Sequence, residues 1–166
     1  TGEGKTYVGI VFAALKRLKT AIIINTSKIK TQWYESLLKY TDIDKRSILE
    51  VKGSRMCLDI IDKPHRYKQI DVFIITHSLI HSFCKQYGWN CLRDLFKAMK
   101  VGIKIYDEAH LEFRNMVKID CYTNTKYSIY LTATFGRSAI SEDYVYQKCF
   151  LSCPKYIQKK INNVGK

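Results

Sequence analysis

The first six residues contain the most recognisable chemistry in the sequence. Gly2-Glu3-Gly4-Lys5-Thr6 matches the second half of the phosphate-binding pattern G-x-x-x-x-G-K-[ST], whose first glycine would lie two positions before Thr1. Glycines in such a loop let backbone N–H groups approach phosphate oxygens, and the helix that follows directs its positive N-terminus at them. Lys5 would reach the β- and γ-phosphates of ATP, and the Thr6 hydroxyl would bind Mg²⁺. A surface Gly-Lys turn is the alternative interpretation.

A second candidate group is the acidic pair Asp107 and Glu108, within Asp-Glu-Ala-His at 107–110. The pair directly follows the apolar stretch 101–106, which has the composition of a buried strand. In open parallel sheets, ligands bind beyond the carboxyl ends of the strands. Asp107 could hold Mg²⁺ there, directly or through water, and Glu108 could orient and deprotonate an attacking water molecule. The alternative is a solvated acidic pair at the start of a helix, where the helix dipole favours negative charge.

A third, weaker pattern is Thr132-Ala133-Thr134, at the end of the last apolar stretch. Its two hydroxyls could bond alternately to the region of His110 and to nucleic-acid phosphates. A threonine-rich strand end is an ordinary alternative, because threonine favours strands. The pattern is weak by itself, and it becomes more specific because it follows the other two segments in the chain.

The three segments need elements that bring them together, and the hydrophobic pattern predicts such elements. Short apolar runs alternate with stretches in which apolar residues recur at helical spacing. Strands are predicted at 21–25, 47–51, 71–75, 101–106 and 127–131, and helices at 8–18, 29–38, 79–83, 92–99 and 111–117. The stretch 55–61 fits either type. Strands that alternate with helices indicate a parallel sheet covered on both faces, here in a single α/β domain spanning residues 1–166.

Charge and cysteine content narrow the range of partners. The chain has 28 Lys and Arg against 15 Asp and Glu, and its net charge of +13 attracts polyanions, nucleic acid first. A lysine-rich, solvated surface would give the same count. No apolar run reaches the length of roughly 18 residues that a membrane span needs, so none is expected.

The six cysteines form no CxxC pair and are expected to be reduced thiols. Two weak candidate metal sets are His81 with Cys84 and Cys91, and Cys149 with Cys153.

In this order, the phosphate-binding segment, Asp-Glu-Ala-His and Thr-Ala-Thr resemble the motifs of superfamily-2 helicases and translocases of the DEAH type. Ile24-Asn25-Thr26-Ser27 followed by Gln32-Trp33 is similar to that family's motif Ia, and the run 74–79 is similar to its motif Ic. The run 131–135 is similar to motif III. The resemblance extends to about residue 137. Among subfamilies it is nearest to the branch-remodelling helicases of phages and large viruses.

The resemblance implies a role in the ATP site for seven residues. The segment that would bind ATP is Gly2, Glu3, Gly4, Lys5 and Thr6. Thr6 and Asp107 would hold Mg²⁺. The residues that would serve hydrolysis are Lys5, Asp107 and Glu108.

The resemblance also implies contacts to nucleic acid. Contacts to the sugar-phosphate backbone carry no sequence information, and they would come from Thr26, Ser27, Lys28 and Thr76. The residues that would couple the nucleotide state to nucleic acid are His110, Thr132 and Thr134. His77 is expected to be a packed or capping residue. Trp33 is expected to be a core residue, because it shares the apolar face of its helix with Ile29 and Leu37.

A RecA-like three-layer α/β sandwich is the fold that this resemblance implies. The strand that feeds the phosphate loop is expected at the centre of the sheet, so its absence from the sequence predicts a gap or a weakened core. The family's second RecA-like domain and its arginine finger, worth about 10³–10⁵ in rate, have no counterpart in these residues. The chain alone is therefore expected to hydrolyse ATP poorly and not to unwind. It is expected to be an intracellular monomer whose partner is nucleic acid, DNA more than RNA.

Three other functions stay open on the sequence. The motor subunit of a restriction or remodelling complex translocates on duplex DNA without separating the strands, and its motor domain would carry the same motifs. A nucleic-acid-binding module that has lost catalysis is disfavoured by intact Lys5, Asp107 and Glu108. A P-loop ATPase that acts on proteins is disfavoured by the net charge of +13 and by the presence of both Asp-Glu-Ala-His and Thr-Ala-Thr in the sequence.

Overall fold

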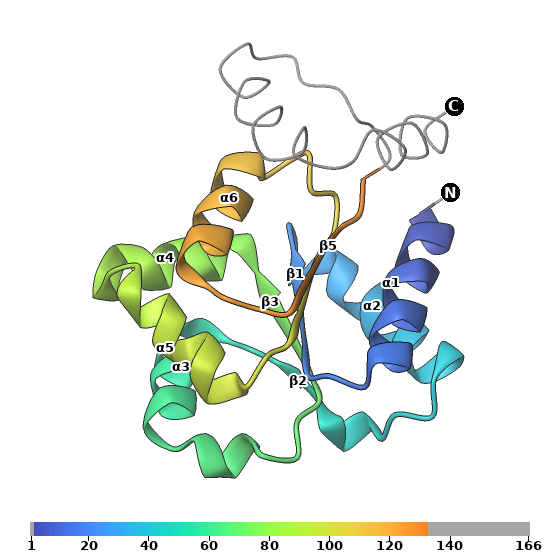
Figure 1. Ribbon diagram of the computed structural model, residues 1–166, viewed down its shortest axis with the longest axis horizontal. Coiled ribbons are helices and arrows are strands. Elements are labelled where there is room, and N and C mark those ends of the chain that lie inside the picture. The colour runs from blue at the N-terminus through green and yellow to red at the C-terminus, as the bar shows by residue number, and fades with distance from the viewer. Residues whose placement is uncertain (1, 133–166) are drawn as a thin grey trace.

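A computed structural model describes residues 2–132 and contains a five-stranded parallel sheet between two layers of helices (Figure 1). The strands are β1 (Thr20–Ile24), β2 (Ile48–Glu50), β3 (Val72–Thr76), β4 (Ile103–Tyr106) and β5 (Tyr127–Tyr130). Their order in the sheet is β2-β3-β1-β4-β5, and every pairing is parallel. The five strands predicted from the apolar runs and the RecA-like α/β class are therefore confirmed. The predicted site residue Thr134 lies outside the described residues, as do Cys149 and Cys153.

Helices cover both faces of the sheet (Figure 1). One face carries α1 (Gly2–Lys16) and α2 (Lys28–Tyr40), and the other carries α3 (Gly53–Asp62), α4 (His77–Tyr87), α5 (Asn90–Met99) and α6 (Phe113–Tyr122). Two short 3-10 helices, Lys45–Ser47 and Pro64–Tyr67, precede β2 and β3. The ambiguous stretch 55–61 is helical, as part of α3. None of the helices within residues 2–132 combines the length and the apolar character that a membrane span requires.

The two faces of β1 belong to two separate hydrophobic clusters. Ala21 and Ile23 pack with residues of α3 to α6, whereas Ile22 and Ile24 pack with residues of α1 and α2. Because helices bury both faces, the strand is a continuous apolar run rather than an alternating one. Trp33 lies in the second cluster with none of its surface exposed, which confirms its predicted core position.

Within residues 2–132 the five strands pair without a gap, so the gap expected from the missing phosphate-loop strand does not occur. β1 occupies the middle position, where Ile22 pairs with Ile74 of β3 on one side and with Ile105 of β4 on the other. Residues Thr20–Ile23 of β1 therefore pair with a neighbouring strand on both sides. The hydrophobic pattern of a sequence identifies strands but does not order them, so it did not show that β1 is the middle strand.

His77 begins α4 and is buried, as expected for a packed histidine. Its ring stacks on that of Tyr106, with 6.1 Å between centroids and 23° between planes. Neither ring nitrogen has a hydrogen-bond partner among the described residues. Burial lowers the pKa of His77 to about 4, because the imidazolium ion would lose its hydration.

We expect His77 to make the stability of the fold depend on pH. The pKa of this histidine is lower in the folded protein than its ordinary value of 6.5, so the unfolded chain binds the proton more readily. The free energy of unfolding should therefore be highest above pH 6.5 and fall as the pH drops toward 4. At pH 5 the loss should be about 2 kcal/mol. Urea denaturation at pH 7 and pH 5 measures it. His77→Phe keeps a stacked ring that cannot be protonated, and an equal loss in that variant would assign the pH dependence to other groups.

Candidate active site

The candidate residues gather at one edge of the sheet, because the carboxyl ends of parallel strands meet there. The N-terminal end of α1 lies at the same edge (Figure 1). The residues at this edge are Lys5 and Thr6 on α1, Thr26, Ser27 and Lys28 after β1, Thr76 at the end of β3, the segment 107–110 after β4, and Thr132 after β5. The fold therefore brings the described residues of all three predicted segments to one edge of the sheet.

Lys5 and Glu108 form the central contact of this edge. The Nζ atom of Lys5 lies 2.5 Å from Oε1 of Glu108, although 103 positions separate the two residues in the sequence. The side chains are only 22% and 26% exposed. Two opposite charges this far from bulk water attract each other more strongly than they would on an open surface. The contact places the predicted phosphate-binding cation beside the predicted general base.

The backbone at Glu108 is left-handed, with φ of 47°. This conformation costs a non-glycine residue roughly 1–2 kcal/mol, so neighbouring contacts must hold it. Asn25, directly after β1, donates its side-chain amide to the carbonyls of Asp107 and Glu108 at 3.4 and 3.5 Å. The N–H of Leu111 donates to the Glu108 carbonyl at 2.9 Å. Strained backbone of this kind clusters at functional sites, which supports a chemical role for Glu108.

Asp107 is a buried carboxylate, with only 6% of its surface exposed. Its backbone N–H donates to the Ile23 carbonyl at 3.0 Å, which extends the pairing of β4 with β1 by one residue. Its Oδ2 atom accepts a hydrogen bond of 2.8 Å from Nε1 of Trp33. A buried carboxylate is costly without such donors. The sequence predicted that Trp33 lies in the core, but hydrophobic periodicity does not show where the one polar atom of a core side chain finds its partner.

His110 connects the second motif with the third. Its Nδ1 atom lies 2.8 Å from the Thr132 hydroxyl and 3.3 Å from Oε2 of Glu108. The backbone adds to this connection, because the Ala109 N–H donates to the Leu131 carbonyl at 2.9 Å. The predicted proximity of the Thr132 hydroxyl and the His110 region is therefore present in the structure.

The residues at the edge fit a nucleotide with Mg²⁺. Residues 2–5, predicted as a loop, form the first turn of α1, and the first four N–H groups of a helix have no intrahelical acceptor. Gly4 is exposed, and a side-chain carbon added there would meet nothing within 4 Å. No group of three His, Cys, Asp or Glu side chains within residues 2–132 could hold a metal ion alone. Mg²⁺ commonly binds through one or two protein oxygens together with substrate phosphates, which suits Thr6 and Asp107.

The residues predicted to contact nucleic acid form two groups at this edge. Thr26, Ser27 and Lys28 are exposed where the chain leaves β1 and begins α2. Thr76 lies on the adjacent strand, paired with Ile24. Its hydroxyl accepts a hydrogen bond of 3.2 Å from the Leu79 N–H and so caps α4. The structure thus gives Thr76 a role in starting a helix that the sequence did not indicate.

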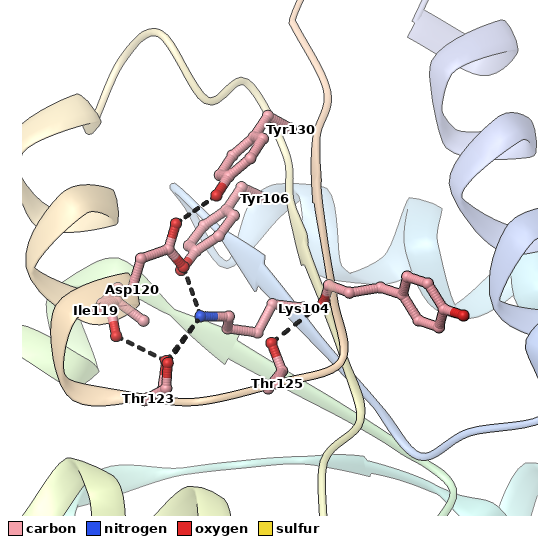
Figure 2. A network of polar contacts seen from close by, with 8 residues as sticks. Lys104, Tyr106, Ile119, Asp120, Thr123, Thr125 and Tyr130 are labelled. Atoms are coloured by element: carbon pink, nitrogen blue, oxygen red, sulfur yellow. Dashed lines mark hydrogen bonds and ion pairs between the residues drawn. The ribbon is translucent and has the colours of Figure 1, made fainter. Parts of the chain in front are cut away.

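A buried polar network lies behind this edge, between β4, β5 and α6 (Figure 2). Lys104 of β4 is 2% exposed, and its Nζ lies 2.5 Å from Oδ1 of Asp120 and 2.8 Å from the Thr123 hydroxyl. The hydroxyl of Tyr106 donates to Oδ1 of Asp120 at 2.6 Å, and that of Tyr130 donates to Oδ2. The rings of Tyr106 and Tyr130 stack at 5.3 Å. Sequence reasoning missed this network, although a lysine inside an apolar strand was a signal for it.

Burial and charge act in opposite directions on this network. Burial lowers the pKa of Lys104, while the nearby carboxylate of Asp120 acts to raise it. Burial, followed by the Asp120 charge, raises the pKa of Tyr106 well above its usual value. Tyr106 therefore stays a neutral donor. Its backbone leads directly into Asp107, so the network anchors the strand that carries the candidate magnesium ligand.

Within residues 2–132 the cysteines belong to no cluster of three His, Cys, Asp or Glu side chains that could hold a metal ion. Cys57 and Cys84 are buried, and burial raises the pKa of each thiol to about 11. A thiol with so high a pKa stays protonated at neutral pH and is a poor nucleophile. Cys91 instead donates to the Tyr87 carbonyl at 3.0 Å.

Comparison with known proteins identifies relatives for this arrangement. Residues 1–137 match the protein family described as "Type III restriction enzyme, res subunit". The chain is similar to "DNA 3'-5' helicase XPB" of Kineococcus radiotolerans, with 30% identity over 137 residues that cover 82% of this chain and 22% of that protein. It is also similar to "Putative helicase 161L" of Invertebrate iridescent virus 6, with 29% identity over 147 residues that cover 83% of this chain and 28% of that protein. The matched region is therefore about a quarter of the length of each relative.

Proposed function

The chain belongs to the family of type III restriction enzyme res subunits, and from that membership we propose that it is the ATP-hydrolysing motor domain of a DNA helicase or translocase. The observation that carries the proposal is the 2.5 Å contact between Lys5 and Glu108, beside the buried carboxylate of Asp107. Phosphoryl transfer to water uses a cation for the phosphates, a ligand for the metal and a group that activates water. The proposal concerns the full-length protein, because the chain covers about a quarter of its relatives.

In the proposed reaction, Lys5 releases Glu108 and binds the phosphates of ATP instead. The phosphates of ATP arrive at the N-terminus of α1 and compete with Glu108 for Lys5. The freed carboxylate of Glu108 accepts a proton from the attacking water. The water oxygen forms a bond to the γ-phosphorus as the bond to the β,γ-bridging oxygen breaks, giving ADP and phosphate. Thr6 and Asp107 would hold Mg²⁺, which would neutralise charge on the β- and γ-phosphates.

His110 is the proposed link between hydrolysis and nucleic acid. Its contacts to Glu108 and to Thr132 support this role, because they connect the Lys5–Glu108 pair with the segment after β5. We propose that His110 and Thr132, together with Thr134, couple the nucleotide state to nucleic-acid binding. The opposite wall of the ATP site would come from a second RecA-like domain of the full-length protein, with its arginine finger.

The proposed substrate is DNA, contacted through its backbone. The net charge of +13 attracts a polyanion, and Thr26, Ser27 and Lys28 offer two hydroxyls and a cation beside Thr76. DNA is favoured over RNA because the family description names a restriction enzyme and one relative is described as a DNA helicase.

The DEAH-type assignment rests on residues 107–110, and the similarity to a viral protein supports the placement among helicases of large viruses.

Removal of the Lys28 charge should weaken DNA binding equally for all sequences. We expect Lys28→Ala in the full-length protein to lower the slope of log K against log salt concentration by about 1, because one phosphate contact is lost. Fluorescence anisotropy with duplex and single-stranded oligonucleotides over a salt series measures the slope. Lys45→Ala is the matched control, since Lys45 is an exposed lysine before β2, at the opposite edge of the sheet. Equal salt-dependence slopes in both variants would show that Lys28 makes no phosphate contact in the proposed interface.

Strand separation and translocation on duplex DNA are distinguished by two assays on the full-length protein. A helicase releases a labelled strand from a partial duplex with ATP. A duplex translocase, the alternative favoured by the family's restriction-enzyme description, displaces a triplex-forming strand but leaves the duplex intact. Absence of both activities, together with absence of DNA-stimulated ATP hydrolysis, would contradict the proposed function.

A further inference from the structure

Among residues 2–132 the indole of Trp33 makes a single polar contact, and that contact is to the candidate magnesium ligand. Nε1 is the one hydrogen-bond donor of a tryptophan side chain. It donates to Oδ2 of Asp107 at 2.8 Å, between a helix and a strand end that are 74 positions apart in the sequence. The other carboxylate oxygen, Oδ1, accepts no hydrogen bond from the residues that the structure describes.

The donor is held rigidly by its surroundings. Trp33 is fully buried in a cluster with Ile10 of α1, Ile22 of β1 and Ile105 of β4. The packing is close, because a side-chain carbon added at Gly9 of α1 would lie 3.4 Å from the indole ring. An indole enclosed on all sides cannot change rotamer without displacing its neighbours. The Nε1 atom is therefore a fixed point relative to the sheet.

Core packing alone does not account for this pair. A phenylalanine would fill much of the same space, and an apolar residue at position 107 would avoid the cost of burying a carboxylate. A tryptophan here instead satisfies one carboxylate oxygen and leaves the other for a further ligand. Donors to the outer oxygen or nitrogen of a metal ligand fix its orientation and tune its affinity for the metal.

We propose that Trp33 is a positioning residue for Mg²⁺ binding: its Nε1 holds Oδ2 of Asp107 and so presents Oδ1 to the ion that accompanies ATP. This inference rests on the proposed function, and it assigns to a buried residue of α2 a part in the ATP site. Trp33 does not touch the nucleotide in this proposal. It acts through the orientation of Asp107 alone.

Trp33→Phe in the full-length protein tests the proposal. The variant removes the donor and keeps an aromatic ring in the core. Equilibrium binding of a fluorescent ADP analogue is measured with saturating Mg²⁺ and again with EDTA. We expect affinity with Mg²⁺ to fall by about 10–100-fold, the usual cost of losing such a partner of a metal ligand. Affinity in EDTA should be unchanged, because Lys5 and the N-terminus of α1 act without the metal.

Leu37→Val is the matched control for lost packing. Leu37 lies one turn further along α2, is buried in the same cluster, and has no polar side-chain atom. We expect this variant to lower the melting temperature but to leave the Mg²⁺ dependence of ADP binding at its wild-type value. If Trp33→Phe weakened ADP binding equally with Mg²⁺ and with EDTA, or matched Leu37→Val in both measurements, Trp33 would be a packing residue only.

A measurement on the unaltered protein does not depend on how the variants fold. The Nε1–H resonance of Trp33 is assigned by its loss in Trp33→Phe or, if that variant does not fold, in Trp33→Tyr. We expect it to shift when ADP is added with Mg²⁺ and to stay in place when ADP is added with EDTA. No shift in either case would overturn the positioning role. Failure of the wild-type protein to bind ADP under both conditions would instead contradict the proposed function.

Discussion

Glu108→Gln should lower kcat for ATP hydrolysis by about 10²–10⁴-fold in the full-length protein, the range that a positioned general base contributes. The amide matches the carboxylate in size, but it cannot take a proton from water at neutral pH. Single-turnover hydrolysis of ATP measures the loss in the chemical step without interference from product release.

The same variant should bind ATP at least as tightly as the wild type. Glu108 is the charged partner of Lys5 in the nucleotide-free arrangement, at 2.5 Å, and ATP phosphates must displace it. A neutral glutamine competes less well for the lysine, so part of the cost of binding disappears. Slow hydrolysis with intact or tighter binding separates a lost base from a damaged site, which would lose both.

Glu112→Gln is the control for this experiment. Glu112 lies four residues further along the chain, where its Oε2 accepts a hydrogen bond of 2.9 Å from Asn115 and makes no described contact with Lys5. We expect wild-type turnover from it. If Glu108→Gln also hydrolysed ATP at the wild-type rate, Glu108 would not be the base. If the wild type itself showed no turnover with DNA present, a nucleic-acid-binding module without catalysis would become the better description.

Asp120→Ala should destabilise the fold by about 3–5 kcal/mol, the usual cost of removing one partner of a buried ion pair. Lys104 is 2% exposed and would keep a charge with no counter-ion. The hydroxyls of Tyr106 and Tyr130 would lose their common acceptor as well. Urea denaturation with a constant m-value measures the change in the free energy of unfolding.

Two further variants separate the charge from the hydrogen bonds. Asp120→Asn keeps an oxygen that can accept from Tyr106 but leaves the Lys104 charge uncompensated. The double variant Lys104→Met with Asp120→Asn removes both charges, and we expect it to be more stable than Asp120→Asn alone because no unpaired charge remains in the core. A double variant that is less stable than the single one would mean that Lys104 contributes mainly through its packing and its contact to Thr123.

The strands were predictable from sequence because both faces of the sheet are buried. A strand covered on both faces is a short apolar run, and the runs at 21–25 and 71–75 have few other interpretations. The order of the strands was not predictable in the same way. It depends on pairings such as Ile22 with Ile74 and Ile105, which join distant parts of the chain. That is why the expected gap at the centre of the sheet was wrong.

The site was predictable to the extent that its residues form local patterns. Lys5 and Glu108 belong to short segments whose composition has a chemical reason, and in a parallel sheet such ligand-binding segments lie beyond the carboxyl ends of the strands. Asn25 and Trp33 belong to the run that resembles motif Ia, but that run gave neither residue a partner in segment 107–108. Each makes its hydrogen bond to segment 107–108 across the fold, so its partner could not be read from its neighbours in the chain.

The sequence by itself determined the types of element, the parallel α/β class and the candidate groups for phosphate, metal and water, because these depend on composition and on spacing within a few residues. Only the tertiary structure decided that β1 fills the centre of the sheet. It also decided that Lys5 pairs with Glu108, that Trp33 holds Asp107, and that Asp120 joins β4 to β5. The physical reason is that each residue in these contacts has many possible partners in the chain. The packing of the whole chain determines which distant segment comes within hydrogen-bonding distance.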